Sequence, residues 1–179
     1  MYRIRKQLPS DESAIEALYD RVFGKDRRSR ISYRYREGIA PLEGLCLAAE
    51  AEGTVVGAIR FWPVRFEREP ALLLGPLAIA PEHHGRGVGR ALLAASLTRI
   101  ARRPERLVFL VGDPDYYRRR GFSPVPSGVV MPGADPARLL WRVLRGPAPE
   151  RGMLRRADGR DIRELEDCAA DPDVPGEVA

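Results

Sequence analysis

The stretch PEHHGRGVGRALLAA, residues 81–95, places three alternating glycines directly before a long apolar helix pattern. Gly85, Gly87 and Gly89 carry no Cβ, so the backbone N–H groups of this loop can approach a bulky ligand closely. The first turn of the helix that follows adds unpaired N–H donors and the positive end of the helix dipole. The stretch therefore predicts a cradle for an anionic group of the size of a pyrophosphate.

The segments on either side of this loop predict a βαβ unit. Residues 72–79 read LLLGPLAI, a buried strand interrupted by Gly75 and Pro76, where a bulge or a splayed strand is expected. After the loop, apolar residues recur at helical spacing up to Ile100. Residues 106–111, RLVFLV, then read as a central strand. A strand, helix and strand in this order imply that the two strands are parallel.

Two familiar nucleotide-binding loops do not fit these residues. The dinucleotide fingerprint needs G-x-G-x-x-G and an acidic residue about 20 positions further on. Residues 85–89 read G-x-G-x-G instead, and no acid follows in the next strand before Asp113. A P-loop needs a lysine directly after its last glycine, and the only lysines in the chain are Lys6 and Lys25.

The loop instead resembles the acetyl-coenzyme A binding motif of the GCN5-related N-acetyltransferase superfamily, Gln/Arg-x-x-Gly-x-Gly/Ala. Here that pattern runs from His84 to Gly89, with histidine at its first position. Residues 116–122, YYRRRGF, are similar to the second signature of this superfamily, a tyrosine four residues before a Gly-Phe pair that begins a strand. Residues 112–117, GDPDYY, resemble its YhbS-like branch in particular. Leu110 stands where many members carry an asparagine that contacts the pantetheine arm.

The resemblance implies a single-domain α/β fold with a mixed central sheet, splayed parallel strands and flanking helices. Asp113 and Pro114 are expected to cap and to begin a short helix. Tyr117 matches the general acid that protonates the departing thiolate, since a phenol with a pKa of about 10 is protonated at neutral pH. Three strand residues match positions whose backbone pairs with the pantetheine arm and offers an N–H to the developing oxyanion. The residues implied to bind acetyl-CoA are Leu77, Ala78 and Ile79 on this strand and Gly85, Arg86, Gly87, Val88, Gly89 and Arg90 in the loop.

The predicted activity is acetyl transfer from acetyl-CoA to a primary amine of a small molecule or peptide, by direct attack in a ternary complex. A longer donor such as succinyl-CoA, and a noncatalytic acyl-CoA sensor or interaction module, are the alternatives. The general base is left open among Asp113, Asp115, Glu69 and a water chain to a backbone carbonyl. The adjacent histidines 83 and 84 favour an anion-binding or structural role in the loop.

The rest of the chain predicts further elements of an α/β fold. Residues 2–7 alternate as a strand, and residues 9–12 supply an N-cap signal for a helix that ends near Phe23. A basic helix or turn is expected over residues 26–37. Further strands are expected over residues 45–51 and 54–66, joined by a hairpin turn at residues 52–53, and over residues 129–131 and 139–144.

Length and cysteine usage set the domain organisation. At 179 residues the chain is long enough to bury a core without disulfides. We expect one domain over residues 1–145 and an appended tail over residues 146–179, partly helical or disordered, with a helix-like patch at residues 161–169. Cys46 and Cys168 lie far apart without metal-ligand spacing, so neither a disulfide nor a metal site is expected.

The charge pattern bears on partners and location. The formal net charge is +5, but the basic residues are interleaved with 25 acidic ones, which argues against a nucleic-acid partner. Basic clusters at residues 25–30, 34–36 and 118–120 are interpreted as solvated faces. No segment approaches the ~20 apolar residues of a membrane span. We expect a soluble cytoplasmic protein without a membrane partner, and a homodimer is left open.

Overall fold

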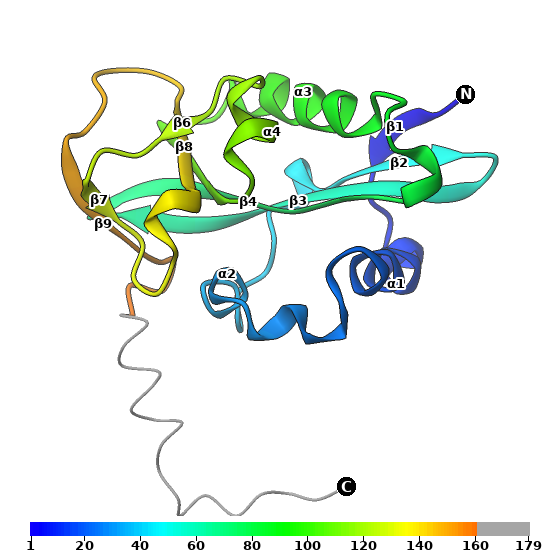
Figure 1. The fold of residues 1–179 in the computed structure, drawn as a ribbon, viewed down its shortest axis with the longest axis horizontal. Coiled ribbons are helices and arrows are strands. Elements are labelled where there is room, and N and C mark those ends of the chain that lie inside the picture. The colour runs from blue at the N-terminus through cyan, green and yellow to red at the C-terminus, as the bar shows by residue number, and fades with distance from the viewer. Residues whose placement is uncertain (161–179) are drawn as a thin grey trace, which may run out of the picture.

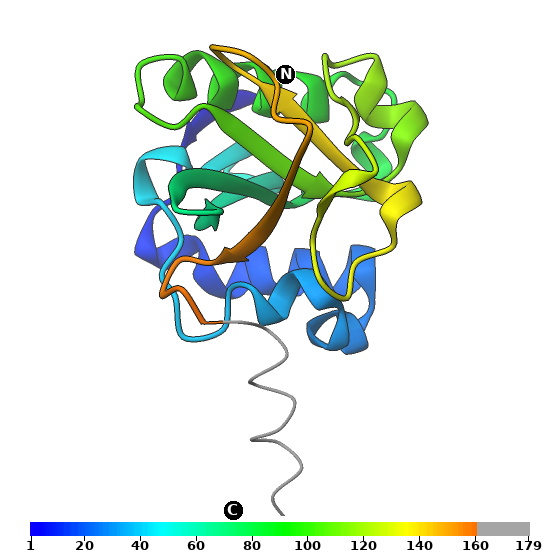
Figure 2. The same ribbon diagram turned by 90° about the vertical axis from the view of Figure 1, so that its left-hand side faces the viewer.

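The computed structural model describes residues 1–160 and shows a mixed sheet with helices on both of its faces (Figures 1 and 2). Its main strand order is β1-β2-β3-β4-β5-β8-β6, and β9 pairs with both β3 and β7. The pairs β4–β5 and β7–β9 are parallel, whereas the other strand pairs are antiparallel. The strands are β1 (Arg3–Lys6), β2 (Leu47–Ala51), β3 (Thr54–Phe66), β4 (Glu69–Ile79), β5 (Leu107–Val111), β6 (Ser123–Pro124), β7 (Gly128–Val130), β8 (Leu139–Val143) and β9 (Arg151–Arg156).

The helices cover the two faces of the sheet separately. In Figure 1, α1 (Glu12–Phe23) and α2 (Ile31–Arg34) lie below the long strands β3 and β4, and α3 (Val88–Ile100) and α4 (Pro114–Arg118) lie above them. Short 3-10 turns are η1 (Pro9–Asp11), η2 (Lys25–Ser29), η3 (Glu43–Leu45), η4 (Pro81–His83) and η5 (Pro136–Arg138). Within residues 1–160, none of the helices has the length and hydropathy needed to cross a bilayer.

The first helix is fixed at both ends by residues that the sequence marks. Before it, the Asp11 carboxylate accepts the Leu8 N–H at 2.7 Å and two guanidinium bonds from Arg5 at 2.6 and 2.9 Å. The Arg5 guanidinium holds the pKa of Asp11 below its ordinary value. The helix ends at Gly24, whose φ of 88° is a conformation that residues with a Cβ rarely adopt. The predicted start and end of this helix are confirmed.

The predicted βαβ unit is present, and its strands part as expected. Pairing between β4 and β5 is limited to Leu72 with Val108 and Leu73 with Phe109. On the other side of β4, the register with β3 shifts so that residues 75 and 76 face the single residue Arg60. Beyond this bulge, β4 continues along β3 while β5 diverges from it, which opens a gap at the carboxyl ends of the two parallel strands.

The structure differs from the sequence-based expectation at two places. The basic segment predicted as one helix or turn forms two separate short elements, η2 and α2. The strand β9 was not predicted: it lies within residues 146–179, assigned from the sequence to a tail, yet it pairs with β3 and buries Leu154 in the core. The sheet therefore continues beyond residue 145. The helix expected at residues 161–169 lies outside the described residues.

Candidate functional site

The glycine loop forms an uncapped helix N-terminus. Gly85 and Gly87 have φ values of 74° and 77°, in the left-handed region that favours glycine. Gly87 is the N-cap of α3 and has no side chain to accept its first-turn N–H groups, and the first turn holds no acidic residue. The N–H donors and the helix dipole at Val88, Gly89 and Arg90 are therefore available to an external anion.

A cleft of about 780 Å³ lies over this loop, and we name it the glycine-loop cleft. Seven of the ten sequence-predicted site residues line it: Ile79, Gly85, Arg86, Gly87, Val88, Gly89 and Arg90. His83, His84, Tyr116 and Arg120 complete its lining. The structure thus brings the loop residues together with the end of β4 and with the α4 region, which is more than 25 residues away in the sequence.

Two of these cleft residues were missed by sequence reasoning. The Tyr116 hydroxyl lies where a Cβ on Gly89 would stand, so this glycine makes room for the tyrosine as well as for a ligand. Arg120 stacks on the Tyr116 ring at 3.5 Å and donates to the Tyr116 carbonyl, while its Nε is buried without a hydrogen-bond partner. For Arg120 the sequence signal was the basic cluster at residues 118–120, and the interpretation of that cluster as a purely solvated face is wrong for Arg120.

The histidine at the first motif position has a local role. His84 Nε2 lies 3.0 Å from the carbonyl oxygen of Ile79, so the ring braces the glycine loop against the end of β4. This contact uses the ring within the protein and fits a structural role for His84 in the loop.

The open edge of β4 presents backbone groups on one side of the gap. The Ala80 N–H donates to the Val56 carbonyl at 2.9 Å, which identifies residue 80 as a hydrogen-bonded partner of β3. Because such pairs alternate in an antiparallel ladder, Ala78 also bonds to β3, whereas the N–H and C=O of Leu77 and Ile79 point toward the gap. Both backbone groups of Leu77 and the N–H of Ile79 therefore remain candidates for ligand pairing, while the Ile79 carbonyl already contacts His84. Ala78, predicted with them, is turned to β3 and its side chain is fully buried.

A second cavity, of about 710 Å³, occupies the gap between β4 and β5, and we name it the splay cavity. It is lined by Leu77 from β4, by Gly112 just after β5, and by Tyr117 from α4. The Tyr117 ring fits against Gly112, where a Cβ would stand 2.7 Å from it, and packs edge-on against Phe122 and Tyr116. Burial raises the pKa of Tyr117 above its ordinary value, so the phenol is protonated throughout the neutral range.

The two adjacent tyrosines therefore serve different spaces. Tyr116 lines the glycine-loop cleft and Tyr117 lines the splay cavity. The expected helix start is confirmed, because the Asp113 carboxylate accepts the Asp115 N–H at 2.9 Å and Pro114 begins α4.

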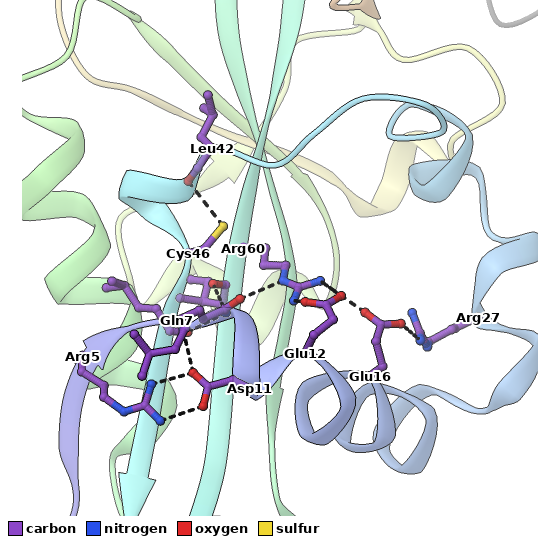
Figure 3. Close-up of polar contacts among 12 residues, drawn as sticks. Arg5, Gln7, Asp11, Glu12, Glu16, Arg27, Leu42, Cys46 and Arg60 are labelled. Carbon is purple, nitrogen blue, oxygen red and sulfur yellow. Dashed lines mark hydrogen bonds and ion pairs between the residues drawn. The ribbon is translucent and has the colours of Figure 1, made fainter.

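A third cavity, of about 430 Å³, lies beside α1 and α2, and we name it the α1 cavity. Figure 3 shows the ion-pair network along its wall. Glu12 bonds Arg60 at 2.5 Å, and Glu16 bonds Arg60 at 3.2 Å and Arg27 at 2.5 Å. Arg27 also pairs with Asp20 at 2.7 Å. Both buried arginines of this network are thus matched by carboxylates.

Arg36 lies between the α1 cavity and the splay cavity and lines both. Only 6% of its surface is exposed, and its Nε and Nη1 have no hydrogen-bond partner. The rings of Tyr33 and Trp62 lie 4.9 and 5.6 Å from its guanidinium carbon. Burial lowers the pKa of Arg36 to about 10, which still leaves it charged at neutral pH. The basic clusters at residues 34–36 and 25–30 were interpreted as solvated faces, and this interpretation is wrong for Arg36 and Arg27, which are buried.

Two of the three carboxylates named as alternatives for the general base, Asp113 and Glu69, have structural partners. Asp113 caps α4, and Glu69 lies 3.2 Å from Arg106. The residue that acts as base stays open. Among residues 1–160, no group of three or more His, Cys, Asp or Glu side chains is arranged to hold a metal ion.

Comparison with known proteins identifies the family. The model of the Acetyltransferase (GNAT) family matches residues 12–122. The uncharacterized N-acetyltransferase YjhQ of Escherichia coli K12 is 32% identical over 131 residues, which cover 71% of this chain and 72% of YjhQ. YhbS of the same organism, also named an uncharacterized N-acetyltransferase, is 33% identical over 122 residues, which cover 67% of this chain and 72% of YhbS.

Solved structures agree with these matches. The crystal structure of YhbS from Escherichia coli in complex with CoA has a TM-score of 0.71 at 26% identity, over 89% of this chain and 92% of YhbS. A GNAT family acetyltransferase from Brucella melitensis in complex with acetyl-CoA has a TM-score of 0.64 at 25% identity, over 87% of this chain and 95% of its own. The sequence matches and the shared fold show that this chain is a YhbS-like member of the acetyltransferase (GNAT) family.

Proposed function

We propose that this protein transfers the acetyl group of acetyl-CoA to a primary amine by direct attack in a ternary complex. The observation that carries the proposal is the uncapped glycine loop, from which the open edge of β4 leads to the splay cavity and Tyr117. Two solved relatives are in complex with CoA or acetyl-CoA, which supports the same type of ligand here.

The residues of the glycine-loop cleft fit a pyrophosphate. Gly85 has open space where a Cβ would stand, and the uncapped N–H groups of α3 supply neutral donors. Arg86 and Arg90 line the cleft and add charge-assisted bonds, and we add Arg120 to this set because its Nε is buried without a partner. The cleft thus combines neutral donors with cations.

The open edge of β4 and the splay cavity would hold the reacting end. Acetyl-CoA supplies the acetyl group as a thioester. Leu77 directs its N–H into the gap, where it can pair with the pantetheine arm or with the oxyanion that develops on the carbonyl. As the amine nitrogen bonds to the carbonyl carbon and the C–S bond breaks, Tyr117 gives its proton to the departing sulfur. The nitrogen loses one proton to water as it becomes an amide, and Tyr117 regains a proton from water. The amine enters from the face of the sheet that α1 and α2 cover, where the α1 cavity lies.

A matched pair of glycine variants tests the cosubstrate site. Gly85 and Gly53 have φ values of 74° and 76°, and neither has a neighbour within 4 Å of an added Cβ. Alanine at either position costs about 1–2 kcal/mol of strain, but only Gly85→Ala places a methyl group in the cleft. We expect Gly85→Ala to weaken acetyl-CoA binding at least about tenfold in calorimetry and Gly53→Ala to leave it unchanged.

Thiol release measured with several acyl donors and a panel of amines separates the remaining alternatives. Equal loss of affinity in the two glycine variants would remove the glycine loop from the site. Tight acetyl-CoA binding with no release of CoA thiol in the presence of any amine would favour a sensor. Faster release of thiol from succinyl-CoA than from acetyl-CoA would identify succinyl-CoA as the preferred donor.

A further inference from the structure

Arg36 is a buried cation without an anion. Its Nε and Nη1 are fully buried and unpartnered, and among residues 1–160 no carboxylate forms an ion pair with it. A guanidinium removed from water loses a large hydration energy, which an ion pair or a full set of hydrogen bonds normally offsets. The rings of Tyr33 and Trp62 offset only part of this loss.

The neighbouring buried arginines show what this position lacks. Arg27 and Arg60 are also almost fully buried, but carboxylates of α1 neutralise both of them. Carboxylates therefore lie beside Arg27 and Arg60, which link α1 to η2 and to the sheet. Arg36, which lines two cavities, has no such carboxylate. The hydroxyl of Tyr19, which lines the α1 cavity, is also buried without a partner.

The backbone is shaped to hold the guanidinium against the break in β4. A Cβ on Gly75 would stand 2.9 Å from Arg36 Nη2, so the missing side chain makes room for this nitrogen. Each edge of a guanidinium joins Nη2 to one of the two unpartnered nitrogens, and either edge can give two parallel bonds to a carboxylate. Gly75 precedes Leu77 by two residues, a span of at most about 7 Å along an extended strand.

We propose that Arg36 binds the carboxylate of the acceptor, so that the substrate of this enzyme is a small amino acid whose amine lies a few bonds from its carboxylate. The inference rests on the acetyltransferase function proposed above. The short span from Arg36 to the Leu77 backbone sets the distance between the bound carboxylate and the nitrogen that is acetylated. A carboxylate is favoured because it is planar and matches one edge of the guanidinium.

The test compares free amino acids with their carboxamides and with their decarboxylated amines as acceptors of acetyl-CoA. We expect kcat/KM for the carboxylates to exceed that for the matched carboxamides by about 10- to 100-fold, the range for hydrogen bonds to a charged group. Arg36→Met should abolish this preference and leave acetyl-CoA affinity unchanged. Arg30→Met is the matched control, because Arg30 lines the same splay cavity but is exposed and donates to the Phe23 carbonyl.

A second measurement uses the wild-type protein and needs no variant to fold. In nitrogen-labelled protein, the Nε–H resonance of Arg36 should shift and saturate on titration with acetate and stay fixed on titration with methylammonium chloride. Failure of acetyl-CoA to bind, or of any amine to be acetylated, would count against the proposed function, and the acetate titration would still decide the carboxylate site.

Five results would overturn the inference, and the first four concern the carboxylate and Arg36. The wild-type enzyme would acetylate amines without preference for those that carry a carboxylate, or Arg30→Met instead of Arg36→Met would abolish the preference. Arg36→Met would lose acetyl-CoA affinity, or acetate would leave the Arg36 resonance unmoved. Faster acetylation of phosphoethanolamine than of any amino acid would likewise replace the carboxylate by a phosphate.

Discussion

Tyr116 and Tyr117 are adjacent in the sequence, yet their side chains line different cavities. Their rings meet edge-on at 4.9 Å, yet Tyr116 reaches the glycine loop at Gly89 and Tyr117 lines the splay cavity. Substitution of the two hydroxyls should therefore affect different kinetic constants, because one borders the proposed pyrophosphate site and the other the proposed leaving sulfur.

The first prediction concerns these two hydroxyls. Tyr117→Phe keeps the ring contacts to Phe122 and Tyr116 and removes only the proton donor, so kcat should fall by about 10²- to 10⁴-fold while acetyl-CoA affinity persists. Tyr116→Phe should raise KM for acetyl-CoA with a much smaller effect on kcat. Steady-state kinetics checks both, and equal losses of kcat in the two variants would indicate packing rather than proton transfer.

The pH profile gives a second test of the same residue. A proton donor is active below its pKa and loses activity as the pH rises through it. Burial raises the pKa of Tyr117 above the ordinary value of about 10, so Tyr117 itself causes no alkaline fall in kcat below about pH 10. Wild-type kcat measured from pH 6 to 10 should rise or level off, and a fall centred near pH 8 or 9 that is absent in Tyr117→Phe would contradict the raised pKa of Tyr117.

At the scale of elements, the break in β4 organises the whole site. Gly75 and Pro76 form the bulge opposite Arg60, the Trp62 indole donates to the Gly75 carbonyl at 2.7 Å, and Arg36 packs against the bare Cα. The bulge and the divergence of β5 could be predicted from the sequence, because glycine and proline in an apolar strand are local signals. Arg36 could not be predicted, because its burial depends on a glycine about 40 residues away.

Alanine at this bulge should destabilise the fold. Gly75 has a φ of 127°, which alanine rarely adopts, and its new Cβ would press on the buried Arg36 guanidinium. We expect Gly75→Ala to lower the free energy of unfolding by about 1–3 kcal/mol. Gly44→Ala is the control, because Gly44 has open space for a Cβ and an ordinary φ. Denaturant unfolding measures both, and an unchanged midpoint for Gly75→Ala would show that the bulge tolerates a side chain.

At the scale of the molecule, the sequence predicts the elements around the glycine loop better than the strand β9 that extends the sheet. The glycine loop, α3 and the two parallel strands follow from local glycine, proline and periodicity signals. The strand β9 does not, because its six residues, RGMLRR, alternate weakly between apolar and charged, and its partners in β3 lie about 90 residues earlier in the chain. Pairing over such a separation is set by the register of the complete sheet, which no short motif encodes.

The last prediction tests whether β9 belongs to the cooperative fold. Leu154 is 1% exposed and packs in the cluster that contains Phe66 and Phe109, and β9 extends the sheet along β3 where β2 has ended. Leu154→Ala should therefore lower the free energy of unfolding by about 2–5 kcal/mol, the cost of a cavity in a packed core. Val130→Ala in the neighbouring strand β7 is the control, because Val130 is 42% exposed and its truncation should cost no more than about 0.5 kcal/mol. Equal midpoints for the two variants in denaturant unfolding would mean that β9 is an appendage, and the domain would then end where the sequence first placed its limit, at residue 145.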